Sequence, residues 1–431
     1  MADYYKVLDL KYKKITLDNG LEVILYKDNS VPSVAVNLWY KVGSANEKPG
    51  KTGLAHLFEH MMFQGSLHVP KEMHFKYIQE AGGTLNATTS SDRTNFFETL
   101  PSSALDLALW LEADRMGFLL PALTEEKFEN QREVVMNERL QRYDNQPYGL
   151  AWEILFSNLF PENHPYHWPT IGWMQDIKNY TLDDVKNFFR TYYAPNNASL
   201  VIAGDIDYDN AIASVKKYFD EIKPNENIPK INVPEFNLEK SKEIVHYDNV
   251  QLPRLYLMWK SNPLYQEDDA KLDVLSDVLS SSKTSRMYKT LVYEKQLALE
   301  VLAYQYSGQY EGIFIIVVTP IPGIDLVEIE KIIFDELNNI YDEGITEEEL
   351  QKAINTIISG NIYSLQNISS VANQLNNYNC TLGEPNSFIY DIKRYESLNR
   401  EDVRQAAIKY LTKPFVKLSI LPKSKGEEDA R

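Results

Sequence analysis

The stretch Gly53-Leu-Ala-His56-Leu-Phe-Glu59-His60-Met-Met-Phe places two imidazoles and a carboxylate close together in an apolar setting. On a helix, His56 and His60 lie one turn apart and point the same way, and Glu59 shares their face. Two neutral imidazoles at this spacing can hold one Zn²⁺, which leaves positions for a carboxylate and a water molecule. Ionisable side chains among apolar neighbours are costly unless they are paired or metal-bound. The stretch therefore predicts a zinc site, with Glu59 able to act as a base toward the bound water.

A third protein ligand is expected from a second helix further along the chain. Residues 124–140 are predicted to form one long helix, because Thr124 is a suitable N-cap and acidic residues occupy the first turn. A carboxylate is the natural third ligand of a hydrolytic zinc site. The candidates on this helix are Glu126, Glu129, Glu133 and Glu138. Periodicity alone does not choose among them.

Several motifs together resemble those of the pitrilysin-type (M16) zinc peptidases. They are residues 56–60, the Gly-Gly-Thr-Leu-Asn-Ala-Thr-Thr run at 82–89, residues 130–139 and residues 193–205. The order H-x-x-E-H is itself the inverzincin signature. The resemblance covers nearly the whole chain and is greatest to the short bacterial type, which is similar to the processing-peptidase subunits. It implies a zinc-dependent endopeptidase that hydrolyses peptides or unfolded segments.

The resemblance also implies a role for each residue of the site. His56 and His60 correspond to metal ligands, and Glu59 corresponds to the general base. The third ligand corresponds to Glu138, with Glu133 as the alternative. The expected cofactor is one Zn²⁺.

One supporting position departs from the family pattern. Family members often carry a second glutamate seven residues before the third ligand, and this chain has Gln131 there. A neutral amide can still hydrogen-bond a ligating histidine, but it adds no negative charge.

Residues 82–101 are predicted to form two strands joined by a turn, which from the pattern alone is an ordinary hairpin. The resemblance assigns the first of these strands to substrate binding. An open strand edge can hold an extended peptide through backbone hydrogen bonds, so Asn86 and Ala87 are the expected contacts.

The chain is predicted to form two α+β domains of one fold. A proline-rich linker at 223–245 would separate a metal-bearing catalytic domain, residues 1–222, from a second homologous domain, residues 246–431, that lacks metal ligands. Strand-like segments recur in both halves, for example 34–40 and 254–260. Each domain is expected to be a mostly antiparallel sheet with flanking helices, and the resemblance implies that the two enclose a chamber.

Composition excludes some classes of function. The net charge of −17 argues against nucleic-acid binding, which requires basic surfaces. No apolar run approaches the ~18 residues of a membrane span. The single cysteine, Cys380, excludes an internal disulfide. No signal peptide stands at the start of this sequence; its absence is compatible with either compartment, and a cytoplasmic or periplasmic location is expected.

The second half lacks a feature that active family members usually have, an Arg and a Tyr seven residues apart that clamp the substrate. In the matching stretch, 285–300, Val292 or Tyr293 stands where the Arg should be, and Leu299 or Glu300 stands where the Tyr should be. The resemblance therefore suggests the catalytic subunit of a heterodimer, whose non-catalytic homologous partner supplies the Arg/Tyr pair. A homodimer with other clamp residues is the competing arrangement. A metal-free scaffold or binding subunit of a larger complex is the alternative function, which the intact motif disfavours.

Overall fold

The computed structural model describes residues 4–423, which fall into two compact units, each discontinuous in sequence. The first unit comprises Met1–Arg139, Trp168–Asn232 and Gly360–Ile389. The second comprises Leu140–His167, Val233–Ser359 and Tyr390–Arg431. Within the described part of the chain, no helix is both long and apolar enough to cross a membrane.

The first unit is built on a six-stranded sheet with the order β1-β2-β6-β3-β5-β4. Its strands are β1 (Tyr12–Thr16), β2 (Glu22–Lys27), β3 (Ser33–Tyr40), β4 (Thr84–Thr89), β5 (Thr94–Pro101) and β6 (Ala198–Gly204). Strands β2 and β6 run parallel, and the other neighbours are antiparallel. Every residue of β6 is buried, as expected for the interior strand of a sheet covered on both faces. Among the strands of the described residues, β4 pairs only with β5 and forms one edge of this sheet.

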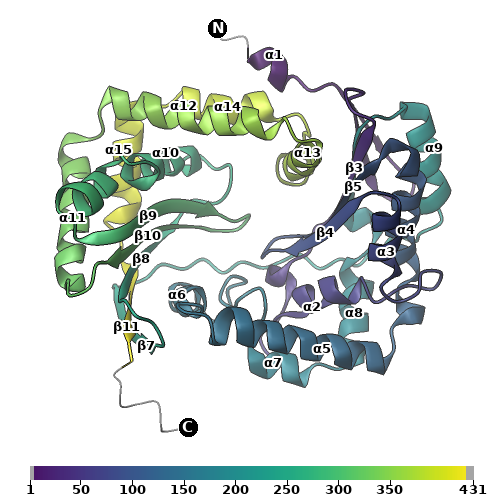
Figure 1. Ribbon diagram of the computed structural model, residues 1–431, viewed down its shortest axis with the longest axis horizontal. Helices are drawn as coiled ribbons and strands as arrows, with labels where there is room; N and C mark the ends of the chain where they lie inside the picture. Colours follow the sequence, from purple (N-terminus) through teal and green to yellow (C-terminus); the bar gives the residue numbers. More distant parts are fainter. Residues whose placement is uncertain (1–3, 424–431) are drawn as a thin grey trace. The chain divides into compact units, whose positions relative to one another are not determined.

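Helices cover both faces of the first sheet (Figure 1). The helices of the first unit are α1 (Tyr5–Leu8), α2 (Leu54–Met61), α3 (Met73–Glu80), α4 (Leu105–Phe118), α5 (Glu125–Arg139), α7 (Met174–Asn179), α8 (Leu182–Tyr192), α9 (Tyr208–Phe219) and α13 (Ile368–Leu382). Helix α13 lies against β3 and β6 on one face, where Asn376 donates a hydrogen bond to the backbone oxygen of Asn37 at 2.8 Å. Helices α2, α3 and α4 contact β3, β4 and β5 on the other face. The helix that covers one face thus comes from the second half of the sequence.

The second unit is built on a five-stranded sheet with the order β7-β11-β8-β10-β9. Its strands are β7 (Lys242–Asp248), β8 (Arg254–Ser261), β9 (Ala298–Ser307), β10 (Gly312–Pro320) and β11 (Phe415–Pro422). Its helices are α6 (Ala151–Leu159), α10 (Asp269–Ser280), α11 (Leu326–Glu343) and α15 (Arg400–Leu411). Helices α12 (Glu347–Ser364) and α14 (Phe388–Glu396) run across the boundaries between the units.

The two sheets have the same connectivity. When β2, β6, β3, β5 and β4 are matched to β7, β11, β8, β10 and β9, the strand order is identical. The one parallel pair of each sheet, β2–β6 and β7–β11, also occupies the same place. The predicted repeats at 34–40 and 254–260 fall in β3 and β8. The predicted α+β class, with two mostly antiparallel sheets of one fold and flanking helices, is confirmed.

The compact units do not follow a single cut in the sequence. Residues 140–167 belong to the second unit and residues 360–389 to the first, so one segment from each half packs with the other half's sheet. The predicted linker, 223–245, contains neither helix nor strand before Lys242. The division into domains at that linker stays a prediction.

Candidate metal centre

Helix α2 carries the motif and has its first turn fixed by buried polar contacts. Gly53, its N-cap, has φ of +90°, and a Cβ there would come within 2.4 Å of the Ile171 carbonyl oxygen, so the position requires glycine. The buried Glu47 carboxylate accepts hydrogen bonds from the backbone N–H groups of Gly53 and Ala55, both at 2.7 Å. It thereby satisfies N–H groups that a helix start leaves without partners. The residues of α2 that face the core are Leu54, Ala55, Leu57, Phe58 and Met61.

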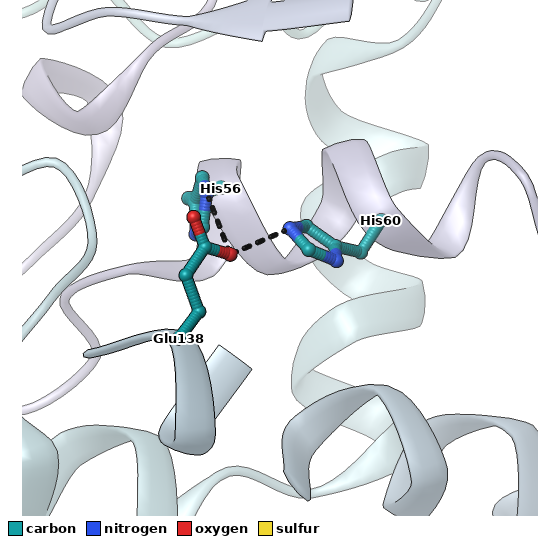
Figure 2. A group of neighbouring side chains, drawn as sticks. All are labelled: His56, His60 and Glu138. Atoms are coloured by element: carbon teal, nitrogen blue, oxygen red, sulfur yellow. Dashed lines mark ion pairs between the residues drawn. The ribbon is translucent and has the colours of Figure 1, made fainter. Parts of the chain in front are cut away.

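The remaining face of α2 presents both histidines to a carboxylate from α5 (Figure 2). The Nε2 atoms of His56 and His60 lie 3.8 and 3.2 Å from Oε2 of Glu138. One ligand atom from each of the three residues lies within 4.8 Å of the others. Around a tetrahedral zinc ion, with bonds of about 2.0–2.2 Å, ligand atoms are roughly 3.3–3.6 Å apart. The three side chains are therefore spaced to close on such an ion after small movements.

The same three side chains keep some access to solvent. The His56, His60 and Glu138 side chains are 15%, 24% and 17% exposed. A catalytic zinc site keeps one position open for water or substrate, whereas a structural site is closed by protein ligands. Two imidazoles, one carboxylate and partial exposure fit the donor set of a hydrolytic zinc centre.

The structure separates the two glutamates that the sequence left as alternatives for the third ligand. Glu138 stands in the cluster, whereas Glu133 is exposed and is not part of it. Gln131 is partly buried two turns before Glu138, on the same side of α5. Helix α5 packs against α2, and the buried Arg139 donates a hydrogen bond to the Gly172 backbone oxygen at 2.8 Å. This contact holds the end of α5 where Glu138 can reach the histidines.

Glu59 lies next to the cluster and is joined to the edge strand. Its Oε2 accepts a hydrogen bond from the Thr89 hydroxyl, at the end of β4. Burial raises the pKa of Glu59 above its ordinary value, and the Thr89 hydrogen bond and nearby His60 act in the opposite direction. A carboxylate beside the three possible ligands can take a proton from a bound water molecule and release it again.

The expected substrate contacts lie on β4, the edge strand. Asn86 is exposed, and its side-chain oxygen accepts a hydrogen bond from the Ala87 backbone N–H at 2.9 Å. Ala87 is 7% exposed and faces the α2 side of the sheet, like Thr89. An edge strand has one row of backbone N–H and C=O groups that its own sheet does not use. This strand therefore ends beside the cluster with an edge that could take up an extended chain.

Two residues of the site, Thr89 and Glu47, are not evident from the sequence. Thr89 lies in the quoted 82–89 run, but only the fold brings its hydroxyl to Glu59. Glu47 precedes α2 by a loop, and nothing in its local sequence indicates that it accepts hydrogen bonds from the start of that helix.

Residues 285–300, where the family resemblance would place an Arg/Tyr pair that this chain lacks, lie in the second unit. Tyr288–Glu294 forms a π-helical turn that leads toward β9, and Tyr293 is 75% exposed. Arg286, the arginine within this stretch, donates two hydrogen bonds to the Glu349 carboxylate, both at 2.7 Å. That bidentate ion pair uses Arg286 within its own unit.

Comparison with known proteins identifies the family. Residues 22–166 match the family model described as Insulinase (Peptidase family M16), and residues 179–357 match the one described as Peptidase M16 inactive domain. The chain is 33% identical to the zinc protease PqqE of Helicobacter pylori over 375 residues, which cover 85% of this chain and 83% of that protein. It is 25% identical to the uncharacterized zinc protease YmxG of Bacillus subtilis, over 95% of this chain and 98% of that one.

A solved structure agrees with these matches. The crystal structure of a protease from Helicobacter pylori superposes with a TM-score of 0.90 at 30% identity, covering 96% of this chain and 100% of that one. Sequence and fold thus lead to the same group of proteins over most of the chain's length. The predicted resemblance is confirmed, and the chain belongs to peptidase family M16.

Proposed function

We propose that this chain is a zinc-dependent endopeptidase that cleaves peptides or unfolded protein segments. The observation that carries the proposal is the convergence of His56, His60 and Glu138 from two helices at distances suited to one zinc ion. The names of the H. pylori and B. subtilis relatives, both called zinc proteases, support the same activity.

In this proposal, His56, His60 and Glu138 hold the metal ion. Bound Zn²⁺ would lower the pKa of a water molecule and polarise the scissile carbonyl. Glu59 takes the proton of the attacking water and then donates it to the departing amine nitrogen. The Thr89 hydroxyl fixes the Glu59 carboxylate in one orientation through its hydrogen bond. This order of proton transfers is general acid–base catalysis by a single carboxylate.

The edge of β4 would hold the substrate as an added strand. Backbone hydrogen bonds at Asn86 and Ala87 would fix an extended peptide beside Glu59, because the same strand ends at Thr89. Binding through the backbone tolerates many side chains, which suits a peptidase of broad specificity. Gln131 would support the centre as a neutral hydrogen-bonding group near Glu138.

We further propose that the active form is a dimer whose homologous partner supplies an Arg/Tyr pair. The support is that none of Val292, Tyr293, Leu299 or Glu300 provides that pair in its expected order, while Arg286 is engaged with Glu349. A missing oxyanion donor would cost about a hundredfold in rate or more.

The alternative is a non-catalytic scaffold or binding subunit. The match of residues 179–357 to the inactive-domain model favours such a role for the second half of the chain. The first half argues against it for the whole protein, because a scaffold gains nothing from bringing two histidines and two glutamates together in a partly buried site.

Metal analysis combined with cleavage of a mixed peptide library tests these proposals. The purified chain is assayed alone and with a homologous chain from the same genome that has the Arg/Tyr pair but lacks the H-x-x-E-H motif. One zinc per chain, with cleavage that rises at least tenfold in the mixture, is the expected result. Full activity without the partner would reject the heterodimer and keep the peptidase. No zinc and no cleavage in either sample would favour the scaffold.

A further inference from the structure

A polar cavity of about 460 Å³ lies in the first unit, between the sheet and the start of α13. Thr88 of β4, Asn95 of β5 and Arg93 from the turn between them line one side, and the first turns of α13 contribute Ser369, Asn373 and Gln374. Its volume lies within the range of ordinary ligand pockets, roughly 300–1,000 Å³. The proposed zinc site does not use this cavity.

The strand register places the cavity on a definite face of the sheet. Thr88 of β4 pairs with Asn95 of β5, so these two side chains lie on one face. Asn86 shares that face, because side chains two residues apart on a strand point the same way. Ala87 and Thr89 point to the opposite face, toward α2. The cavity therefore lies beside the proposed peptide-binding edge, on the side away from α2.

The polar groups of the cavity are held in place. Nη1 of Arg93 donates hydrogen bonds to Oδ1 of Asn95 at 2.8 Å and to the Thr88 backbone oxygen at 3.0 Å, and its guanidinium lies 5.1 Å from the Trp39 ring centre. Asn95 is 2% exposed and donates in turn to Oδ1 of Asn37, which is equally buried. A guanidinium fixed in this way loses little side-chain entropy when it binds a further group.

The charge of the cavity differs from that of the chain as a whole. The chain has 61 acidic and 44 basic residues, yet the residues that line this cavity include one arginine and no carboxylate; the Arg93 charge also acts on the Glu59 carboxylate, which lies outside the lining. The other lining groups are mainly amides and hydroxyls, which can donate hydrogen bonds to an anion. A carboxylate is the anion that a peptide brings with it, and a guanidinium pairs well with a carboxylate.

We infer that this cavity is a specificity site that binds a carboxylate of the substrate peptide. An extended peptide added to β4 would direct every second side chain toward the face of Asn86 and Thr88, and so toward Arg93. The carboxylate could be an Asp or Glu side chain or the free C-terminus of the peptide. This inference rests on the proposed peptidase function, and it predicts that an anionic group at a fixed distance from the cut determines where the chain is cleaved.

Paired peptides test the inference. A fluorogenic parent peptide that the protein cleaves is varied by placing Glu or its neutral isostere Gln at each position, and each version is made with a free or an amidated C-terminus. The wild type is expected to cleave the peptide with Glu at one or two alternate positions about tenfold faster, as kcat/KM, than its Gln partner. A preference for the free over the amidated terminus would identify the terminal carboxylate as the bound group. Cleavage of all versions at equal rates would overturn the inference while leaving the peptidase intact.

An isosteric change in the cavity provides the matched comparison. Gln374→Glu places a carboxylate among the lining groups with almost no change in shape, and is expected to abolish or reverse the Glu preference, measured as the ratio of kcat/KM for the Glu and Gln peptides. Gln366→Glu makes the same change at an exposed position outside the cavity, and is expected to keep the preference. Asn373→Asp serves as a second cavity variant if Gln374→Glu folds poorly. Cavity variants that keep the full Glu preference would contradict the inference.

Binding separates this inference from the peptidase proposal. If the wild type cleaves no peptide, the peptidase proposal fails, and the labelled Glu and Gln peptides are then compared by fluorescence anisotropy. Tighter binding of the Glu peptide that Gln374→Glu abolishes would still support the cavity as a carboxylate site. Equal binding would overturn it.

Discussion

Thr89 donates a hydrogen bond to Glu59 and so joins the last residue of the edge strand β4 to the helix that carries both histidines. Since Glu59 is the proposed base and β4 the proposed peptide-binding edge, one contact aligns the two parts of the site. A strand added to β4 would be held in a fixed position relative to the base.

Removing this contact is expected to impair the base without removing the metal. Thr89→Val deletes the hydroxyl donor, so the charged form of Glu59 loses stabilisation and its pKa rises further. The acidic limb of the kcat profile should move to higher pH, with about a tenfold loss of kcat at neutral pH. Zinc content should not change. Thr89→Ser keeps the donor and should resemble the wild type; an unshifted pH profile in Thr89→Val would show that the hydroxyl does not support the base.

The third metal ligand is tested by two matched changes on α5. Glu138→Gln removes the carboxylate that lies 3.2 Å from Nε2 of His60. Changes around metal ligands typically cost 10–100-fold in affinity, so loss of a ligand should weaken zinc binding by more than about a hundredfold. Glu133→Gln alters an exposed side chain and should leave affinity unchanged. Competition with a chelator of known affinity measures the zinc affinity of each variant. Weaker zinc binding in Glu133→Gln but not in Glu138→Gln would make Glu133 the third ligand instead of Glu138.

The start of α2 is expected to be sensitive to a single methyl group. In Gly53→Ala, the new Cβ would lie 2.4 Å from the Ile171 oxygen, in a backbone conformation with φ of +90°. Gly50→Ala is the control, because φ there is +85° but no atom lies within 4 Å of a Cβ. The control should lose about 1–2 kcal/mol of unfolding free energy from the left-handed conformation alone. Gly53→Ala should lose clearly more and should also bind zinc more weakly; equal losses in denaturant titrations would show that the clash is relieved at no cost.

Acid stability is expected to depend on a histidine outside the metal centre. His74 is 1% exposed, and burial, aided by nearby Arg115, lowers its pKa from 6.5 to about 3. Below pH 6.5 the unfolded chain therefore binds a proton that the folded chain does not, so the folded state loses stability as pH falls from about 6.5 toward 3. His74→Gln can retain the donor to the Leu111 carbonyl without titrating. Its unfolding free energy should fall less steeply between pH 6 and 4, and an unchanged slope would contradict this account.

The parts of the molecule that were predictable from sequence depend on local spacing. The shared face of His56 and His60 could be predicted from helical geometry alone. The strands at 34–40 and 254–260 could be predicted from the strand-like pattern of their residues. The place of Glu138 beside the histidines depends on the packing of α5 against α2, which no local pattern encodes. Residues 140–167 and 360–389 each pack with the unit formed mainly by the other half of the chain. This arrangement was also not predictable, because it depends on contacts between residues far apart in the sequence.

The central claim is that Glu59 performs the chemistry on a metal that other residues hold. The most direct measurement compares the wild type with Glu59→Gln for zinc content and peptide cleavage, in the presence of any partner required for activity. The account predicts about one zinc per chain in both proteins, with cleavage in the wild type and at least a thousandfold less in the variant, since a positioned base contributes about 10²–10⁴-fold and this one acts twice. Cleavage that persists in Glu59→Gln, or loss of its zinc, would contradict the claim.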